Sequence, residues 1–154
     1  MNKPLFKTVN KTKIAFLGFN DIGGSGDEIS TATPKTIKDQ IISAKKEAAI
    51  VIATFHFGNE YSKRSLRQQE LARLAIDSGA DIVIGHHPHW VQEYEEYKGK
   101  PIYYSLGNLV FDQMWSTETR KGLIVKIIMK DGQMIDRQET QIIINDFGQP
   151  SPTN

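Results

Sequence analysis

Apolar residues occur along this chain in two alternating patterns, short unbroken runs and repeats of helical spacing. Residues 13–19 form the first unbroken run, which is typical of a strand buried on both faces. Residues 34–47 follow with apolar side chains at intervals of three and four, and Thr33-Pro34 supplies an N-cap and a first-turn proline. We therefore predict a buried strand followed by an amphipathic helix.

The same succession is repeated further along the chain. Residues 50–53 form a second apolar run, and a helix is predicted from Ser65, which has capping-box spacing to Gln68, to a stop at Gly79. Residues 82–84 form a third run. Two successive strand–helix–strand units predict a parallel sheet with right-handed crossovers, in which the loops after the strands meet at one edge and form the usual place for a ligand.

Beyond residue 90 the pattern is typical of antiparallel hairpins. We expect residues 90–97 to pair with 101–106, and residues 122–129 to pair with 134–144 around Asp131-Gly132. The predicted fold class is α/β, with parallel βαβ units followed by antiparallel hairpins.

The two ends lack these patterns. Residues 1–12 carry several lysines and no acid, and residues 145–154 are rich in turn-forming residues, so we expect a basic tail, a folded part over 13–144 and a flexible tail. The glycine-rich segment 23–26 lacks the GxxxxGK[ST] spacing of a phosphate loop, and we interpret it as a flexible connection.

The amino-acid composition excludes several kinds of binding and catalytic site. The chain has 19 basic and 18 acidic residues among 154, which argues against a broad nucleic-acid surface, and we expect no nucleic-acid partner. It has no cysteine, so disulfides, thiolate metal sites and cysteine nucleophiles are excluded, and a metal would need histidine, carboxylate or amide ligands. No apolar stretch is long enough to span a bilayer, and no secretory signal is recognisable; localisation stays open.

All four histidines follow predicted buried strands: His56 after one, and His86, His87 and His89 after the next. Because Pro88 disfavours the helical region for His87, we expect an extended segment in which His87 and His89 point the same way and His86 the opposite way. If the two strands are neighbours, roughly 4.8 Å apart, His56 joins them and three imidazoles can bind a transition metal. The alternative, ordinary loop and core histidines without an ion, stays open.

Further polar residues near the histidines are secondary candidates: Glu60, Asp81, Ser105, Gly107 and Asn108. Each has an ordinary alternative, since Glu60 can be a solvated loop acid, Asp81 a turn residue before a strand, and Gly107-Asn108 a turn. Three arginines at the second predicted helix are candidates to face an anionic substrate, although such residues are usually solvated: Arg64, Arg67 and Arg73.

Three segments, HFGNEY at 56–61, GADIVIGHHPH at 79–89 and YSLGNLVFD at 104–112, resemble the bacterial capsule-synthesis CapA family in order and spacing. The resemblance covers about residues 13–130. This family is associated with poly-gamma-glutamate capsules and is similar to calcineurin-like metallophosphoesterases, which implies part of a layered αββα sandwich and a two-metal hydrolase site.

By this resemblance His56 and His87 ligate one divalent metal, His89 serves a second, and Glu60 and Asn108 line the site with catalytic roles. The metal identity is left open among manganese, iron and zinc. The resemblance implies an anionic polymer or a capsule precursor as partner.

The chain also departs from the family pattern. It begins after the acidic and asparagine–histidine motifs of the family's N-terminal half, and Phe57 stands where tryptophan is usual. We therefore expect weak metal binding, little hydrolase activity and apolar sheet surface that promotes self-association. A non-catalytic module of the same fold, which binds a polymer or partner, is the alternative.

Overall fold

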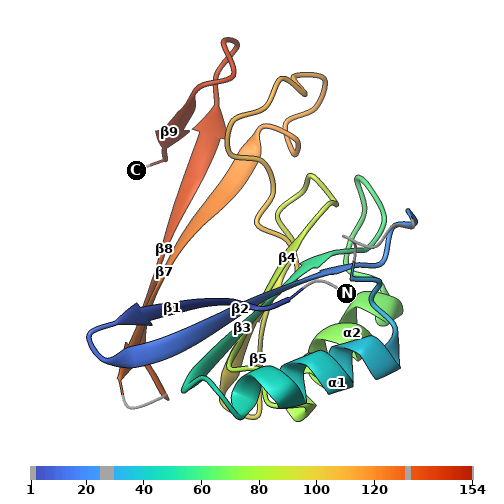
Figure 1. The fold of residues 1–154 in the computed structure, drawn as a ribbon. Coiled ribbons are helices and arrows are strands. Elements are labelled where there is room, and N and C mark those ends of the chain that lie inside the picture. Colours follow the sequence, from blue (N-terminus) through green and yellow to red (C-terminus); the bar gives the residue numbers. More distant parts are fainter. Residues whose placement is uncertain (1–2, 25–29, 131–132, 154) are drawn as a thin grey trace.

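Two β-sheets form the framework of the computed structural model, which describes residues 3–24, 30–130 and 133–153 (Figure 1). The larger sheet has the strand order β1-β2-β3-β4-β6-β5, and the smaller has the order β7-β8-β9. Within the described residues the strands are β1 (Leu5–Val9), β2 (Thr12–Asn20), β3 (Ile50–His56), β4 (Ile82–His86), β5 (Tyr94–Tyr97), β6 (Lys100–Tyr103), β7 (Lys121–Lys130), β8 (Gln133–Ile144) and β9 (Pro150–Pro152).

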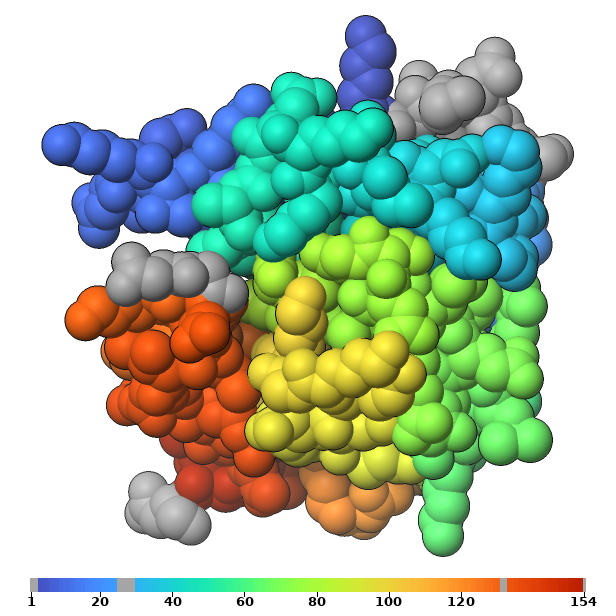
Figure 2. All heavy atoms as spheres, turned by 90° about the horizontal axis from the view of Figure 1, so that it is seen from below, coloured from blue at the N-terminus to red at the C-terminus, as the bar shows by residue number. Residues whose placement is uncertain are grey.

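Two helices, α1 (Pro34–Lys45) and α2 (Leu66–Asp77), cover one face of the larger sheet. They lie side by side, with the β5–β6 hairpin beside α2 (Figure 2). Thr33 caps α1, and Ser65 and Gln68 form a complete capping box at the start of α2, as the sequence predicts.

Strands β2, β3, β4 and β6 run parallel, so both predicted strand–helix–strand units and the α/β class are confirmed. Both predicted hairpins are also confirmed, as the antiparallel pairs β5–β6 and β7–β8. The predicted turn at Asp131-Gly132 and part of the glycine-rich segment 23–26 lie outside the described residues.

The hydrophobic core lies between the helices and the larger sheet. Ile37 and Ile41 of α1 and Leu71 of α2 are fully buried against the parallel strands. Aromatic rings continue the core toward the carboxyl edge of the sheet, since Phe55 stacks on Phe19 at 5.0 Å and on Phe57 at 5.1 Å between ring centroids.

The structure corrects the expected tails. Leu5–Val9 forms β1, which pairs with β2, because Phe6 packs against the core and the Asn10-Lys11 turn reverses the chain. Pro150–Pro152 forms β9 on β8, after a turn in which the Asn145 side chain accepts hydrogen bonds from two backbone N–H groups. No helix of the described segments has the length and apolar character needed to cross a membrane.

Candidate functional site

The histidine-bearing loops begin at the same edge of the larger sheet. His56 ends β3 and His86 ends β4, and the two residues are register partners in the parallel pair. The ring centroid of His87 lies 4.7 Å from that of His56 and 6.2 Å from that of His89. The fold therefore brings the three predicted ligand residues together.

The loop does not have the predicted conformation. His87 has φ +103° and His89 has φ +60°, so the segment is a strained turn and the expected extended conformation is wrong. Hydrogen bonds to the neighbouring loop hold this turn, since Phe57 N–H donates to the His86 carbonyl at 3.1 Å and Tyr61 N–H to the Pro88 carbonyl at 2.9 Å. The three imidazoles thus lie close together because of this turn, and not because of the expected alternation of side chains in an extended segment.

Asn108 determines which nitrogen of His89 is free. The Asn108 amide N–H donates to the Thr119 carbonyl at 2.9 Å, which leaves its Oδ1 as an acceptor, 2.9 Å from His89 Nδ1. His89 Nδ1 therefore carries the proton, and Nε2 keeps its lone pair. This arrangement is typical of metal-binding histidines, whose second nitrogen donates to a neighbouring acceptor.

The pKa is lowered at two histidines of the cluster, His87 and His86. Burial, then repulsion from His56 and His89, lowers the pKa of His87, although Glu60 acts in the opposite direction. Burial and His56 also lower the pKa of His86. Neutral imidazoles are the form that binds metals. Glu60 itself is exposed and lies close enough to His87 to influence its pKa.

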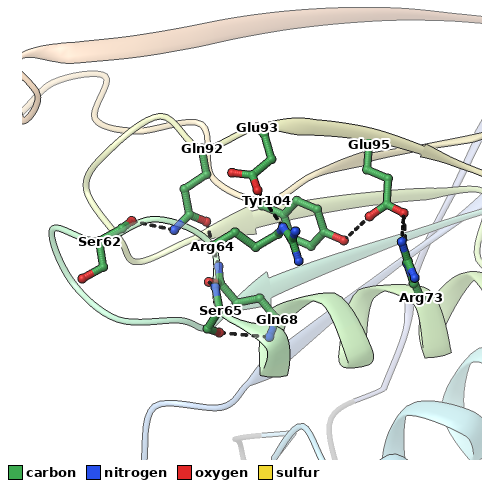
Figure 3. A network of polar contacts seen from close by, with 9 residues as sticks. All are labelled: Ser62, Arg64, Ser65, Gln68, Arg73, Gln92, Glu93, Glu95 and Tyr104. Carbon is green, nitrogen blue, oxygen red and sulfur yellow. Dashed lines mark hydrogen bonds and ion pairs between the residues drawn. The ribbon is translucent and has the colours of Figure 1, made fainter.

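A polar network supports the loop after β3 (Figure 3). Gln68, which is fully buried, accepts from Ser65 N–H at 2.9 Å and donates to Gln92 at 2.9 Å. Gln92 in turn donates to the Ser62 carbonyl at 2.9 Å, and Arg64 pairs with Glu93 at 2.7 Å. The network ties the loop that carries Glu60 to the segment that follows the histidine turn.

The same network continues along α2. Burial alone would raise the pKa of Glu95, but hydrogen bonds from Tyr104 and Arg73, at 2.5 and 2.6 Å, outweigh it and lower that pKa. Burial and Glu95 raise the pKa of Tyr104. This end of β5 is thus fixed to the helix.

Two glycines permit close approach in this region: Gly58 lets the loop after β3 approach α2, and Gly85 lets β4 approach the backbone at Tyr104. Gly58 has φ +95°, and a Cβ there would lie 2.5 Å from the Gln68 side chain. A Cβ on Gly85 would lie 2.0 Å from the Tyr104 carbonyl oxygen. Neither position accommodates a larger residue without movement of its neighbours.

Other candidates have structural partners elsewhere. Asp81 is buried at the opposite end of β4, where it accepts from Val51 N–H at 2.8 Å and pairs with Lys45 at 2.6 Å and Lys100 at 3.2 Å. Ser105 is buried and accepts from the N–H of Gly107 at 3.2 Å. The three candidate arginines are each paired with an acid: Arg64 with Glu93, Arg67 with Asp21 and Arg73 with Glu95.

The sequence interpretation missed the aromatic residues around His89. Tyr61 stacks on His89 at 5.8 Å, Phe111 lies 5.2 Å from it, and Trp115 meets Tyr61 edge-on at 4.7 Å between centroids. Tyr61 and Phe111 fall within the family-like segments, which is the signal that could have identified them.

The donor types fit a transition metal, and the three rings lie close together. Among the residues that the structure describes, however, no group of three or more histidine, aspartate or glutamate side chains has an arrangement suited to hold an ion. The fit is therefore one of ligand chemistry and proximity, without a complete coordination set.

Comparisons with known proteins agree with this fold. The chain is 43% identical to the PGA biosynthesis protein CapA of Bacillus subtilis, over 81% of this chain and 35% of that protein. It is 39% identical to the capsule biosynthesis protein CapA of Bacillus anthracis, over 82% of this chain and 34% of that protein. The chain thus spans about a third of the length of these curated relatives.

A solved structure described as a novel phosphatase from Mycoplasma pneumoniae is similar in fold, with a TM-score of 0.64 at 14% identity over 91% of this chain and 57% of that one. A hypothetical protein from Thermus thermophilus has a TM-score of 0.65 at 12% identity, over 90% of this chain and 60% of that one. Residues 1–113 match the family described as bacterial capsule synthesis protein PGA_cap. The chain belongs to this CapA family of capsule synthesis proteins, with a phosphatase-like fold.

Proposed function

We propose that this chain is the histidine-bearing part of a CapA-type protein of poly-gamma-glutamate capsule biosynthesis, and that its histidine turn contributes to a phosphoesterase-like hydrolase site with two divalent metals. The observation that carries the proposal is the proximity of His56, His87 and His89 at the carboxyl edge of the sheet. The hydrogen bond from His89 to Asn108 supports it, because that bond leaves Nε2 free for a ligand.

Each residue has a separate role in this proposal. His56 and His87 hold one ion and His89 the second, while Asn108 fixes the tautomer of His89. Glu60, which is open to solvent and influences the pKa of His87, holds a proton at its carboxylate during hydrolysis in this proposal. Divalent ions, when bound, would polarise the phosphoester-like bond and stabilise the charge that develops as it breaks.

Three imidazoles without a carboxylate that joins two ions make an incomplete catalytic site. We therefore expect the 154-residue chain to bind divalent metal weakly and to have little hydrolase activity alone. The test is hydrolysis of bis(4-nitrophenyl) phosphate by the purified chain with Mn²⁺ or Zn²⁺. Little turnover is expected. Robust metal-dependent turnover that disappears in His87→Ala would contradict the incompleteness of the site.

A second candidate is a non-catalytic module that binds an anionic polymer or a capsule precursor. The lack of a complete metal-holding group among the described residues favours it. Elemental analysis by mass spectrometry separates the two candidates, because stoichiometric metal supports the hydrolase site and none supports the module. Co-sedimentation with poly-gamma-glutamate, unchanged by EDTA, is the positive result expected for the module.

A further inference from the structure

Tyr61 contacts the histidine turn with both its ring and its backbone. The ring stacks on the imidazole of His89, with 5.8 Å between ring centroids and 24° between ring planes. The Tyr61 N–H donates to the carbonyl of Pro88, the residue before His89, at 2.9 Å. A centroid distance of this size is typical of offset aromatic stacking. Both contacts join the loop after β3 to the histidine turn.

Tyr61 is also fixed to a third segment, the loop between β6 and β7. Gln113 Nε2 donates to the Tyr61 hydroxyl at 2.9 Å, and the Trp115 ring packs edge-on against the Tyr61 ring at 4.7 Å between centroids. Gln113 is itself held, because its carbonyl accepts from the hydroxyl of the buried Thr119 at 2.7 Å. Tyr61 is therefore held at its backbone, its ring and its hydroxyl group.

The backbone of Tyr61 has a conformation that bulky residues rarely adopt. Its φ is +54°, in the left-handed region. Such a conformation persists only where the surrounding structure imposes it, and it is most frequent at functional sites. Glycine would adopt this φ without the steric cost of a side chain. The presence of tyrosine here is therefore explained by what its side chain contacts.

The stacking of Tyr61 complements the hydrogen bond between His89 and Asn108. Asn108 Oδ1 lies 2.9 Å from His89 Nδ1 and selects the tautomer with the proton on Nδ1. A single hydrogen bond leaves the imidazole free to tilt, and a ring stacked on it restricts that motion. Phe111 also contacts His89, but its ring is tilted by 44° and its side chain is 38% exposed. Tyr61 is the more firmly held of the two aromatic neighbours.

We propose that Tyr61 is a positioning residue for the candidate site, whose ring holds the His89 imidazole against Asn108 so that Nδ1 keeps the proton and Nε2 keeps its lone pair. In this role Tyr61 acts through His89. The inference rests on the proposed function for its consequence, because a fixed Nε2 matters to the site only when His89 is a metal ligand. Loss of a neighbour that orients a ligand histidine weakens metal binding by about 10- to 100-fold.

The first measurement is the tautomer of His89 in EDTA at about pH 8, where ordinary imidazoles are neutral. Long-range ¹H–¹⁵N NMR distinguishes protonated from unprotonated ring nitrogens. We expect a single Nδ1–H form in the unaltered chain and in Tyr61→Phe, which keeps the ring, and a mixture of both tautomers in Tyr61→Leu. Tyr94→Leu is the matched control, because Tyr94 is a half-buried tyrosine on β5 whose ring meets Tyr103 at 5.0 Å. It should leave the His89 tautomer unchanged.

The second measurement is titration of the same chains, freed of EDTA, with Zn²⁺. We expect about tenfold weaker binding in Tyr61→Leu, and unchanged binding in Tyr61→Phe and Tyr94→Leu. A single Nδ1–H tautomer in Tyr61→Leu, or Zn²⁺ binding there as strong as in the unaltered chain, would overturn the proposal.

If Tyr61→Leu unfolds, the unaltered chain decides. Nuclear Overhauser contacts between the Tyr61 and His89 rings, together with a single Nδ1–H form, would support the positioning role, and the absence of either would overturn it. If the unaltered chain binds no Zn²⁺, the proposed function fails, whereas the tautomers in EDTA still decide the role of Tyr61.

Discussion

Asn108 joins the histidine turn to the loop that follows β6. Its side-chain oxygen lies within hydrogen-bond distance of His89 Nδ1, and its side-chain N–H donates to the carbonyl of Thr119. A side chain that satisfies one buried and one part-buried partner contributes to stability as well as to the orientation of a ligand.

Asn108→Ala is therefore expected to lower the free energy of unfolding by about 1–3 kcal/mol, because it leaves buried polar groups without partners. Urea denaturation measures this change. Asn59→Ala, at an exposed position in the neighbouring loop, is the control and is expected to have little effect. Equal effects of the two substitutions would show that the Asn108 hydrogen bonds are unimportant for stability.

His86, at the exposed end of β4, predicts a small pH dependence of stability. Burial and His56 lower its pKa in the folded state below the ordinary value of 6.5. As the pH falls, the unfolded chain takes up this proton first, so the stabilising contribution is complete above pH 6.5 and is lost as the pH falls through the folded pKa. Urea denaturation of the unaltered chain and of His86→Gln, between about pH 7.5 and about pH 5.5, measures it. His86→Gln should lose less stability over this range, and identical slopes would contradict the assignment.

At the scale of elements, the parallel strands and both helices could be predicted because unbroken apolar runs and helical spacing are strong local signals. Strand β1 is not evident from the sequence because its apolar residues, among them Phe6, lie in a short segment with Lys3, Lys7 and Lys11 and no acid, which resembles a tail. The histidine turn was missed because hydrogen bonds from the distant Tyr61 loop override the preference that Pro88 imposes. The candidate histidines were identified, whereas their aromatic neighbours depend on contacts between loops.

The two glycines Gly58 and Gly99 test how tightly the loop after β3 is packed. Both have positive φ, +95° and +72°, but a Cβ on Gly58 would meet Gln68 at 2.5 Å, whereas one on Gly99 would meet nothing within 4 Å. Gly99→Ala should cost about 1 kcal/mol from backbone strain, and Gly58→Ala should cost at least about 1 kcal/mol more, from the steric clash. Denaturant unfolding compares them. Equal stability of the Gly58→Ala and Gly99→Ala chains would contradict the close packing of Gly58 against Gln68.

At the scale of the whole molecule, an apolar cleft separates the larger sheet from β7. Its volume is about 380 Å³, and aliphatic side chains of β2, β3, β4 and β7 line most of it, including Ile14, Ile52, Ile84 and Ile127. The helices cover the other face of this sheet. Because this apolar surface is not covered by the helices, we still predict that copies of the chain associate through it.

Sedimentation velocity tests this prediction over a range of protein concentrations. We expect association that Ile127→Lys weakens, because the new charge lies in the cleft. Ile124→Lys, on the opposite face of the same strand, is the matched control and should associate as the unaltered chain does. A monodisperse monomer with a sharp cooperative melt would count against the prediction.

The central claim is that the histidine turn of this CapA family member binds a divalent metal. Isothermal titration of the EDTA-treated chain with Zn²⁺ or Mn²⁺ tests it most directly, with His87→Ala as the variant and Asp136→Asn, an exposed acid on β8, as the control. We predict weak saturable binding that His87→Ala weakens at least tenfold and Asp136→Asn leaves unchanged. The absence of saturable binding, or binding that His87→Ala does not alter, would contradict the account.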